Sequence, residues 1–333
     1  MKTKIALLAG GYTGEAEVSY RSAAFVAKNI DPLLFEVYLI IITKEQWFYK
    51  DQNDVLYTIN KEDFSITIEG EKVVFDLAFI MIHGSPGEDG LLQGYFDMID
   101  IPYTSCGTLT SALSMHKAYT KGILRDIPDI NLASSVLLSA DEQEYGANKI
   151  IGKLKTPYFV KPNAGGSSIG MSKVTKEEDL QKAIDLAFNT INTGKEVIVE
   201  EFVEGREFTI GVYRTKGELV VLPATEIIPK NEFFDFEAKY TPGVTEEITP
   251  ADLNEEQKQR IDKIIRSIYE ELNCKGMVRI DFFIEENSDL FYFIELNTIP
   301  GQTETSFIPQ QVRAYGKTEK EFYTEIIQEA LRS

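Results

Sequence analysis

Two carboxylates and an amide near the end of the chain are spaced to bind a divalent cation. Asp281 lies in the run Met-Val-Arg-Ile-Asp-Phe-Phe-Ile, and Glu295 and Asn297 lie in the next, Phe-Tyr-Phe-Ile-Glu-Leu-Asn. Strand alternation puts Arg279 and Asp281 on one face of the first strand. It also puts Glu295 and Asn297 on one face of the second strand. A hairpin register centred on Ser288 brings Asp281 opposite Glu295, where like charges repel unless a cation lies between them. All-oxygen ligands suit magnesium bridging to phosphates, and the alternative is a salt-bridge network with Arg279.

A glycine- and serine-rich loop over residues 161–170 is a candidate phosphate site. It reads Lys-Pro-Asn-Ala-Gly-Gly-Ser-Ser-Ile-Gly, and its closely spaced N–H groups and the hydroxyls of Ser167 and Ser168 are donors that suit phosphate oxygens. Because the lysine precedes the glycines, the loop is not a P-loop. A flexible surface turn is the simpler interpretation. Lys161 at the end of an apolar strand, and a second lysine at Lys117, favour a phosphate site instead.

Two further segments are candidates for contacting a nucleotide or a substrate. Residues 200–207, Glu-Glu-Phe-Val-Glu-Gly-Arg-Glu, would alone be a charged surface connector. Beside a phosphate loop they are a candidate base-binding segment, with Glu207 available to ribose hydroxyls. Residues 83–90, His-Gly-Ser-Pro-Gly-Glu-Asp-Gly, follow an apolar strand at its carboxyl end, where α/β sheets bind ligands. We interpret His83 as a site residue because this loop is too polar to bury it.

The first loop, Gly-Gly-Tyr-Thr-Gly at 10–14, also follows an apolar strand. It lacks the G-x-G-x-x-G spacing, and the second strand ends without an acidic residue for a ribose, so a dehydrogenase is a weak alternative. A tight strand-to-helix turn explains the glycines as well as a ligand does. Glu15, at the start of the next helix, would favour the helix dipole or hold a substrate ammonium group.

Short apolar runs alternate with helical patterns, which predicts an α/β fold whose first part is a parallel sheet. We expect strands over residues 5–9, 35–42, 77–82, 158–160, 197–203, 207–213, 219–224, 277–284 and 290–296, and helices over 17–28, 111–124 and 176–188. The polar stretch over 50–71 is expected to be irregular. The long aromatic loop over 229–250 is expected to be functional.

Two later helices carry capping residues. Ile261, Ile264, Ile265, Ile268 and Leu272 form one apolar stripe, and Thr249 and Pro250 are expected to be the cap and the first helical residue. Thr318 and Glu321 in capping-box spacing predict the last helix.

Composition limits the class of protein. The 333 residues exceed the size of one growing core, so two or three subdomains are expected. A net charge of −19 disfavours nucleic acid and anionic membranes as partners. Two cysteines exclude a disulfide scaffold, and two histidines argue against a His-rich zinc site. The first apolar run stops at Gly10-Gly11, and no run reaches the ~20 residues of a membrane span, which predicts a cytoplasmic protein.

Six ordered motifs make the chain resemble the ATP-grasp carboxylate–amine ligases over essentially its whole length. The motifs are Gly-Gly-Tyr-Thr-Gly-Glu-Ala-Glu-Val-Ser at 10–19, His-Gly-Ser-Pro-Gly-Glu-Asp-Gly at 83–90, Ser-Ala-Leu-Ser-Met-His-Lys at 111–117, Val-Lys-Pro to Gly-Met at 160–171, Glu-Ala-Lys-Tyr at 237–240 and Glu-Leu-Asn-Thr-Ile-Pro-Gly at 295–301. The resemblance implies a Rossmann-like substrate domain over 1–105. It also implies two α+β subdomains, over 106–200 and 201–333, which clasp ATP under a lid formed by 229–250.

The resemblance implies an activity as well: two D-alanine molecules joined at the expense of ATP through an acylphosphate, for peptidoglycan precursor synthesis. Asp281, Glu295 and Asn297 would hold two Mg2+ (or Mn2+) ions. The ATP contacts would be Lys117 and Lys161 to phosphates, Glu200 and the backbones of Glu201 and Val203 to adenine, Glu207 to ribose, and also Ser167, Ser168 and Lys239. The substrate and catalytic residues would be Glu15 for the first ammonium group with Ser167 and Tyr240 linked to it, His83, Arg279 and the Gly301 backbone for the oxyanion, and Ser306 with Lys239 for the second substrate. A homodimer is expected by family likeness.

Some positions depart from the family pattern. His116 stands where an acidic residue is expected, Ala16 where arginine is common, and Gln302 where methionine is frequent; Phe234 and Phe236 replace lid tyrosines. These departures concern lid packing and substrate affinity. The Lys-Tyr pair at 239–240 resembles the dipeptide-forming branch and predicts D-alanine as acceptor, with D-lactate or D-serine ligases and a non-catalytic nucleotide-binding relative as alternatives.

Overall fold

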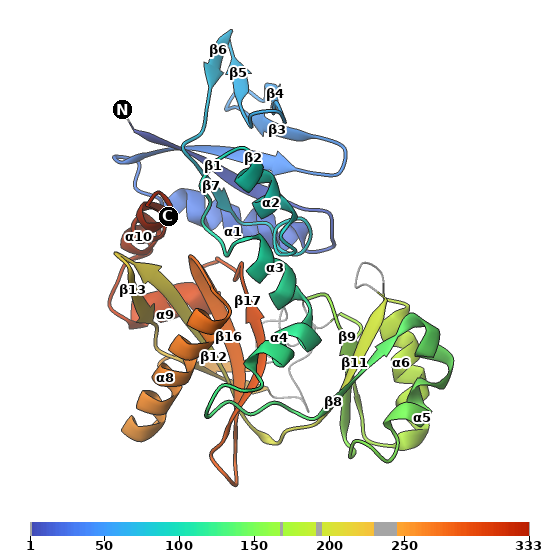
Figure 1. Ribbon diagram of the computed structural model, residues 1–333. Coiled ribbons are helices and arrows are strands. Elements are labelled where there is room, and N and C mark those ends of the chain that lie inside the picture. Colours follow the sequence, from blue (N-terminus) through green and yellow to red (C-terminus); the bar gives the residue numbers. More distant parts are fainter. Residues whose placement is uncertain (1, 167–168, 191–194, 230–244, 333) are drawn as a thin grey trace.

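The computed structural model describes residues 2–166, 169–190, 195–229 and 245–332, and within them the strands form three main sheets. In Figure 1 the N-terminal sheet lies at the top, the large C-terminal sheet below it, and the central-segment sheet to the side. The predicted lid residues 230–244 lie outside the described residues, as do Ser167 and Ser168.

The N-terminal sheet has a parallel centre, as predicted. β1 (Thr3–Gly10) pairs in parallel with β2 (Phe35–Ile42) and with β7 (Leu77–Ile80). The middle of β1 is fully buried, because α1 (Ala16–Asn29) and other segments cover the sheet. The loops after β1 and β7 therefore meet at the carboxyl edge of this sheet, where α2 (Leu91–Met98) follows.

The expectation of an irregular stretch over 50–71 is wrong. It contains β4 (Leu56–Thr58), which pairs with β3 (Trp47–Lys50), and β5 (Ile66–Ile68), which pairs with β6 (Glu71–Val73). Strands of three residues are too short to show alternation in a sequence. Ring packing orders them instead, such as Phe64 against Phe96 with ring centroids 4.9 Å apart.

The second sheet is antiparallel, in the order β10 (Ser172–Val174), β9 (Tyr158–Pro162), β11 (Glu196–Glu201) and β8 (Ser135–Ser139). The short helix α5 (Gly146–Ile150) and α6 (Leu180–Phe188) cover one side, and the predicted first turn of α6 is a 3-10 turn over Glu177–Asp179. Another 3-10 turn, Ala140–Tyr145, follows β8.

The single helix predicted over 111–124 is two helices, α3 (Thr108–Met115) and α4 (Lys117–Leu124). His116 between them has the extended angles φ −101° and ψ 94°, which end one helix and begin the next. Its ring accepts a hydrogen bond from the Tyr119 N–H, so the residue caps α4. Uninterrupted helical spacing in the sequence hid this break.

The C-terminal sheet runs β15 (Thr245–Ile248), β14 (Thr225–Pro229), β12 (Gly205–Thr215), β16 (Met277–Glu285) and β17 (Phe291–Asn297), and β13 (Glu218–Val221) pairs with β12. The end of the predicted 229–250 loop is therefore strand, not loop. The predicted cap at Thr249 is also wrong, since α8 (Glu255–Glu271) begins after Asn254, whose side chain forms a capping box with Gln257. Thr249 instead shares a hydrogen bond of 2.6 Å with Thr225.

The β16–β17 hairpin contains a bulge that decides which side chains meet. Near the turn Phe282 pairs with Phe293, but the next pair is Asp281 with Glu295, so Ile294 has no opposite residue. Without this extra residue Asp281 would lie opposite Ile294, and Glu295 would point to the other face. The predicted pairing of Asp281 with Glu295 is confirmed, and the bulge is its cause.

The last helices connect the sheets. α9 (Phe307–Ala314) packs on β12, and α10 (Glu319–Ala330) begins with the predicted capping box of Thr318 and Glu321. Tyr323 of α10 meets Phe79 of β7 at 5.9 Å between ring centroids, while Phe322 meets Tyr213 of β12 at 4.9 Å. The C-terminal helix thus joins the N-terminal core to the C-terminal sheet (Figure 1).

The division at residues 105 and 200 stays a prediction. Each sheet has its own apolar packing, but Leu124 and Ile130 belong to the core of the C-terminal sheet. None of the helices in the described ranges combines the length and apolarity that crossing a bilayer requires.

Candidate functional site

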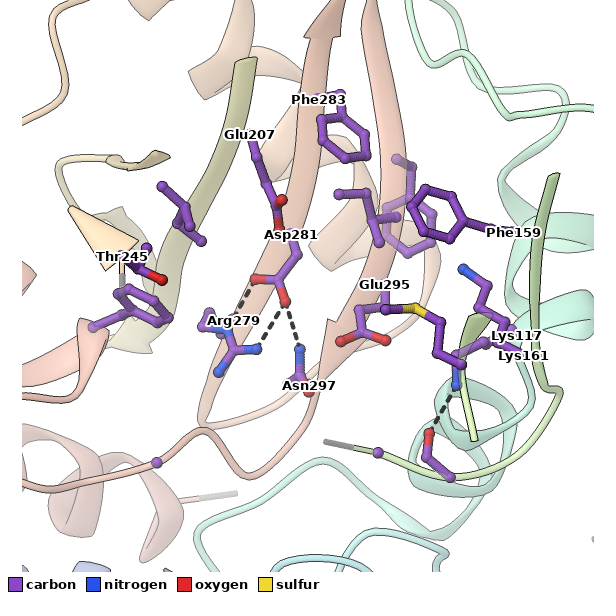
Figure 2. Close-up of a pocket in the computed structure, with 18 of the residues that line it drawn as sticks. Lys117, Phe159, Lys161, Glu207, Thr245, Arg279, Asp281, Phe283, Glu295 and Asn297 are labelled. Atoms are coloured by element: carbon purple, nitrogen blue, oxygen red, sulfur yellow. Dashed lines mark hydrogen bonds and ion pairs between the residues drawn. The ribbon is translucent and has the colours of Figure 1, made fainter. Parts of the chain in front are cut away.

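One cavity of about 830 Å3 lies where the three sheets approach each other. It is lined by every predicted site residue that the structure describes: Glu15, His83, Lys117, Lys161, Glu200, Glu201, Val203, Glu207, Arg279, Asp281, Glu295, Asn297, Gly301 and Ser306. Ser167, Ser168, Lys239 and Tyr240 lie outside the described residues. In Figure 2 Arg279, Asp281 and Asn297 project from the C-terminal sheet, and Lys117 and Lys161 lie on the opposite side.

The Asp281 carboxylate is the centre of a hydrogen-bond network on the C-terminal wall. Arg279 donates to both of its oxygens, with Nε to Oδ1 at 2.9 Å and Nη2 to Oδ2 at 2.7 Å. Asn297 Nδ2 donates to Oδ2 at 3.2 Å, and Thr209 Oγ1 donates to Oδ1 at 2.5 Å. Burial works against the charge on Arg279, but Asp281 and Glu295 together raise the pKa of the guanidinium above its usual value. Arg279 is therefore a fixed cation in the cavity.

The chemistry of Asp281, Glu295 and Asn297 fits a divalent cation. The two carboxylates are cross-strand neighbours, and all three side chains line the same cavity. No cluster of three or more His, Cys, Asp or Glu placed for a metal occurs among the described residues. The Asn297 amide oxygen would be the third oxygen donor beside the two carboxylates. Two carboxylates and an amide suit Mg2+ or Mn2+ better than zinc.

Lys161 and Lys117 provide positive charge on the opposite wall. Lys161 Nζ is 2.5 Å from Glu200 Oε2, and Lys117 Nζ donates to the Gly165 carbonyl at 2.8 Å. Burial lowers the pKa of Lys161, but Glu200, Glu295 and Glu207 outweigh it and raise the pKa overall. Both lysines are thus available as cations to an anionic ligand in the cavity.

The position of Lys117 follows from how α4 is anchored. The Lys117 N–H donates to the Asn163 carbonyl at 3.1 Å, and the Ala118 N–H donates to Asn163 Oδ1 at 3.0 Å. His116 Nε2 is 2.8 Å from Glu196 Oε2 at the start of β11. His116 therefore caps α4 and also contacts the neighbouring strand.

Glu15 is enclosed by two glycines from different loops. A Cβ at Gly84 would lie 2.8 Å from Glu15 Oε2, and a Cβ at Gly166 would lie 3.2 Å from Oε1. Gly84 also has φ +66°, which disfavours other residues. The 83–90 loop and the 161–170 loop thus hold one carboxylate between their backbones, at the amino end of α1.

His83 lies in the cavity wall, but the reason given from the sequence is wrong. The loop buries it to 7% exposure. Its Nε2 is 3.1 Å from Ser22 Oγ, and Ser22 Oγ accepts a hydrogen bond of 3.1 Å from the Gln302 N–H. Burial, followed by the charge of Arg279, lowers the pKa of His83 to about 4 despite a hydrogen bond to the Ile299 backbone. The neutral ring links α1 to the loop that contains Gly301.

Replacing Ser22 with alanine tests this link. The hydroxyl is fully buried, so its loss leaves the Gln302 N–H without this partner. We expect the free energy of unfolding to fall by about 1–3 kcal/mol, measured by urea denaturation. Ser267→Ala is the control, because that hydroxyl makes one exposed bond within α8. Equal, small effects of both substitutions would show that the link contributes nothing.

Glu88 is a lining residue that was not singled out from the sequence, although it lies within the 83–90 motif. Its Oε2 accepts a hydrogen bond of 2.7 Å from the Gly84 N–H. Burial, then the neighbouring charge of Glu15, raises its pKa to about 8, although the Gly84 and Ile299 backbones and Arg279 act in the other direction. At neutral pH this carboxyl group therefore carries a proton.

The shifted pKa values of Glu88 and His83 make the free energy of unfolding depend on pH in opposite directions. Glu88 keeps a proton up to about pH 8 when folded and loses it at its usual 4.5 when unfolded, so its stabilising contribution is lost as pH rises through 8. The His83 pKa is lowered instead of raised, so the stabilising contribution of the neutral ring is lost as pH falls from 6.5 through 4. The two effects oppose each other between pH 4.5 and 6.5, and Glu88 acts alone from 6.5 to 8.

Between pH 6.5 and 8 we expect the free energy of unfolding of the wild type to fall by about 1.4 kcal/mol per pH unit because of Glu88. Glu88→Gln should lack this pH dependence. Urea denaturation of the wild type and the variant at pH 6.5 and pH 8 measures the difference in slope. Glu177→Gln on the surface is the control. Parallel pH profiles of Glu88→Gln and wild type would contradict the assignment.

Other contributors could not be found from sequence patterns. Thr209 lies on β12 and reaches Asp281 only because the two residues pair across strands. Ser22 and Gln302 are separated by 280 residues in the sequence. Such partners carry no periodicity or spacing that links them before the fold is known.

The chain is similar to known proteins over most of its length. The family model described as D-ala D-ala ligase N-terminus matches residues 4–106, and the one described as D-ala D-ala ligase C-terminus matches 127–328. The chain is 45% identical to the D-alanine--D-alanine ligase of Azobacteroides pseudotrichonymphae genomovar. CFP2, covering 97% of this chain and 98% of the relative. It is 43% identical to the ligase of the same name from Bacteroides fragilis, covering 98% and 99%.

Solved structures are similar over the full length. The VanG D-Ala:D-Ser ligase from Enterococcus faecalis has a TM-score of 0.87 and 32% identity, covering 99% of this chain and 100% of that one. The D-alanyl-alanine synthetase A from Vibrio cholerae has a TM-score of 0.85 and 28% identity, covering 100% and 99%.

Proposed function

The chain belongs to the D-alanine--D-alanine ligase family, and from this premise we infer that it is an ATP-dependent ligase that joins two D-alanine molecules and releases ADP and phosphate. Its fold is the expected ATP-grasp fold. A dehydrogenase, the weak alternative from the sequence, is therefore set aside.

One observation supports the residue assignments. The Arg279 guanidinium and a set of oxygen ligands suited to a divalent cation lie on one wall of the cavity, and two lysines lie on the other. Arg279, Asp281 and Asn297 form one wall, and Lys117 and Lys161 form the other (Figure 2). A nucleotide whose phosphates cross this gap would be held by cations from both sides. Positioning and charge neutralisation are the main contributions a protein makes to phosphoryl transfer.

In the first step we propose that the carboxylate of one D-alanine attacks the γ-phosphorus of ATP, giving an acylphosphate and ADP. Lys117 and Lys161 neutralise the phosphate oxygens, while Glu15 holds the ammonium group of this D-alanine. Bound Mg2+ or Mn2+, held by Asp281, Glu295 and Asn297, would supply further positive charge to the phosphates.

In the second step the amine of another D-alanine attacks the acyl carbon, and phosphate leaves. Negative charge develops on the acyl oxygen, and we propose that Arg279 and the Gly301 N–H stabilise it. Ser306 is the N-cap residue of α9, and its Oγ accepts a hydrogen bond of 2.9 Å from the Thr303 N–H. This contact holds the hydroxyl beside Gly301, where it would position the second substrate.

Phosphate release from ATP tests the function. The reaction with D-alanine is run beside reactions with L-alanine, with D-alanine plus D-lactate or D-serine, and without an amino acid, and the products are identified by mass. We expect release that depends on D-alanine and yields its dipeptide. Preferential condensation with D-lactate or D-serine would overturn D-alanine as the acceptor, and ATP binding without D-alanine-dependent release would overturn the substrate.

Three finer points are proposals. We propose two divalent cations per site, checked by titrating Mg2+ in the phosphate assay. We propose a homodimer, checked by light scattering on the purified protein. We propose a cytoplasmic location, checked by fractionation of cells that produce the chain.

A further inference from the structure

Lys121 is a buried lysine whose role the mechanism does not use. It lies on α4, it is 7% exposed, and its Nζ donates to Glu200 Oε1 at 2.5 Å and to the Ala133 carbonyl at 2.8 Å. Ala133 and Glu200 line the cavity, whereas Lys121 is not among the described lining residues. Lys121 therefore contacts two residues of the cavity wall without being a described lining residue itself.

The helix explains why two lysines reach different parts of the cavity. Lys117 and Lys121 are four residues apart, so they lie on the same face of α4 and about one turn apart along its axis. Lys117 reaches the 161–170 loop through the Gly165 carbonyl. Lys121 reaches the end of β11, beside residues 201–203. One helix thus supplies a cation to the phosphate end and another to the proposed base end.

Glu200 is a buried carboxylate with a cation on each oxygen. It is 8% exposed, with Lys121 at Oε1 and Lys161 at Oε2, both at 2.5 Å. Burial would raise its pKa, but Lys161 and Lys121 lower it to about 2, so the group is ionised. Burial lowers the pKa of Lys121, and Glu200 opposes this effect. Each charge depends on its partner, because an unpaired charge here would be strongly disfavoured.

We propose that Lys121 is a positioning residue for the nucleotide base, because it fixes the Glu200 carboxylate as a hydrogen-bond acceptor for the exocyclic amine of adenine. The proposal rests on the proposed ATP-binding function. Lys161 lines the cavity and would also face the phosphates, so its charge would be divided between Glu200 and the phosphates. Lys121 is not among the described residues that line the cavity, and its charge pairs with Glu200. A carboxylate accepts from an amine and repels a carbonyl oxygen, so this arrangement selects adenine over hypoxanthine.

Calorimetric titration with ADP and with IDP, in Mg2+, tests the proposal without requiring turnover. The wild type is expected to bind ADP at least about tenfold more tightly than IDP. Lys121→Met keeps an unbranched side chain of nearly the same length but removes the charge. This variant should bind ADP at least about tenfold more weakly than the wild type and IDP no more than about threefold more weakly. The preference for ADP over IDP would then be lost. Lys182→Met on the exposed side of α6 is the matched control and should bind like the wild type.

Glu200→Gln and the double variant show whether Lys121 acts through Glu200. Once the carboxylate is an amide, removing Lys121 should have little further effect on ADP, and the two effects should not add. Additive effects, an unchanged preference in Lys121→Met, or equal weakening of ADP and IDP would overturn the proposal. Should Lys121→Met fail to fold, the comparison of Glu200→Gln with the double variant still decides, since neither contains the buried Glu200 charge.

The test separates this proposal from the function itself. A wild type that prefers ADP but makes no dipeptide would contradict the substrate assignment and leave the role of Lys121 standing. A wild type that makes the dipeptide equally well with ATP and ITP would contradict the role of Lys121 and leave the ligase function standing.

Discussion

Arg279→Met is expected to lower kcat for D-alanyl-D-alanine formation by about 10²–10³-fold, with the chain still folded. Arg279 is the fixed cation of the C-terminal wall, and its paired carboxylate Asp281, with Glu295, keeps it charged despite its burial. Because the charge on the acyl oxygen develops only in the transition state, the loss should appear mainly in kcat. Steady-state phosphate release with saturating ATP and D-alanine measures it.

Two companion variants make the result specific. Arg279→Lys keeps the charge but not the paired geometry of two N–H donors, so it should recover only part of the rate. Arg214→Met is the control, because Arg214 lies on the neighbouring strand, β12, and pairs with Glu270 at 2.7 Å outside the cavity wall. Arg214→Met should retain wild-type kcat. An Arg279→Met enzyme with more than a tenth of the wild-type rate would contradict the proposed role.

Asp281→Asn is expected to raise the Mg2+ concentration for half-maximal activity by at least about 100-fold and to lower stability by about 3 kcal/mol. The substitution removes one of two carboxylates from the donor set. It also leaves the buried guanidinium of Arg279 without its paired anion. Mg2+ titration of phosphate release measures the first effect, and urea denaturation measures the second.

Glu285→Gln is the control for this variant, because Glu285 lies at the turn end of the same strand and outside the cavity lining. It should leave both quantities near their wild-type values. A loss of stability without a change in Mg2+ dependence would mean that Asp281 serves Arg279 and holds no metal. Full activity of Asp281→Asn with unchanged Mg2+ dependence and unchanged stability would remove both roles.

The sequence predicted which residues line the cavity better than the elements that carry them. Asp281, Glu295 and Asn297 were found because carboxylates in apolar strands are rare, and the motifs around them resemble a known family. Their pairing, however, depends on the unpaired Ile294, and nothing in the hairpin sequence shows that a bulge occurs there. The predicted register was right at Asp281 and off by one residue nearer the turn.

Errors occurred where one local pattern fitted two structures. Thr249-Pro250 resembles a helix start, but Asn254 and Gln257 form the real cap. The spacing over 111–124 is helical throughout, yet the His116 backbone is extended. Its side chain caps α4, and the N–H groups that follow it donate to Asn163. Contacts of this kind link residues far apart in the sequence, so local propensity cannot reveal them.

The C-terminal helix has a consequence for the order in which the molecule is made. Phe322, Tyr323 and Ile326 of α10 complete the apolar core of a sheet whose strands come from the first eighty residues. During synthesis that sheet leaves the ribosome first, but its core stays incomplete until almost the whole chain has been translated. The nascent N-terminal segment must therefore expose apolar surface for most of its synthesis, which is the condition under which chaperones bind.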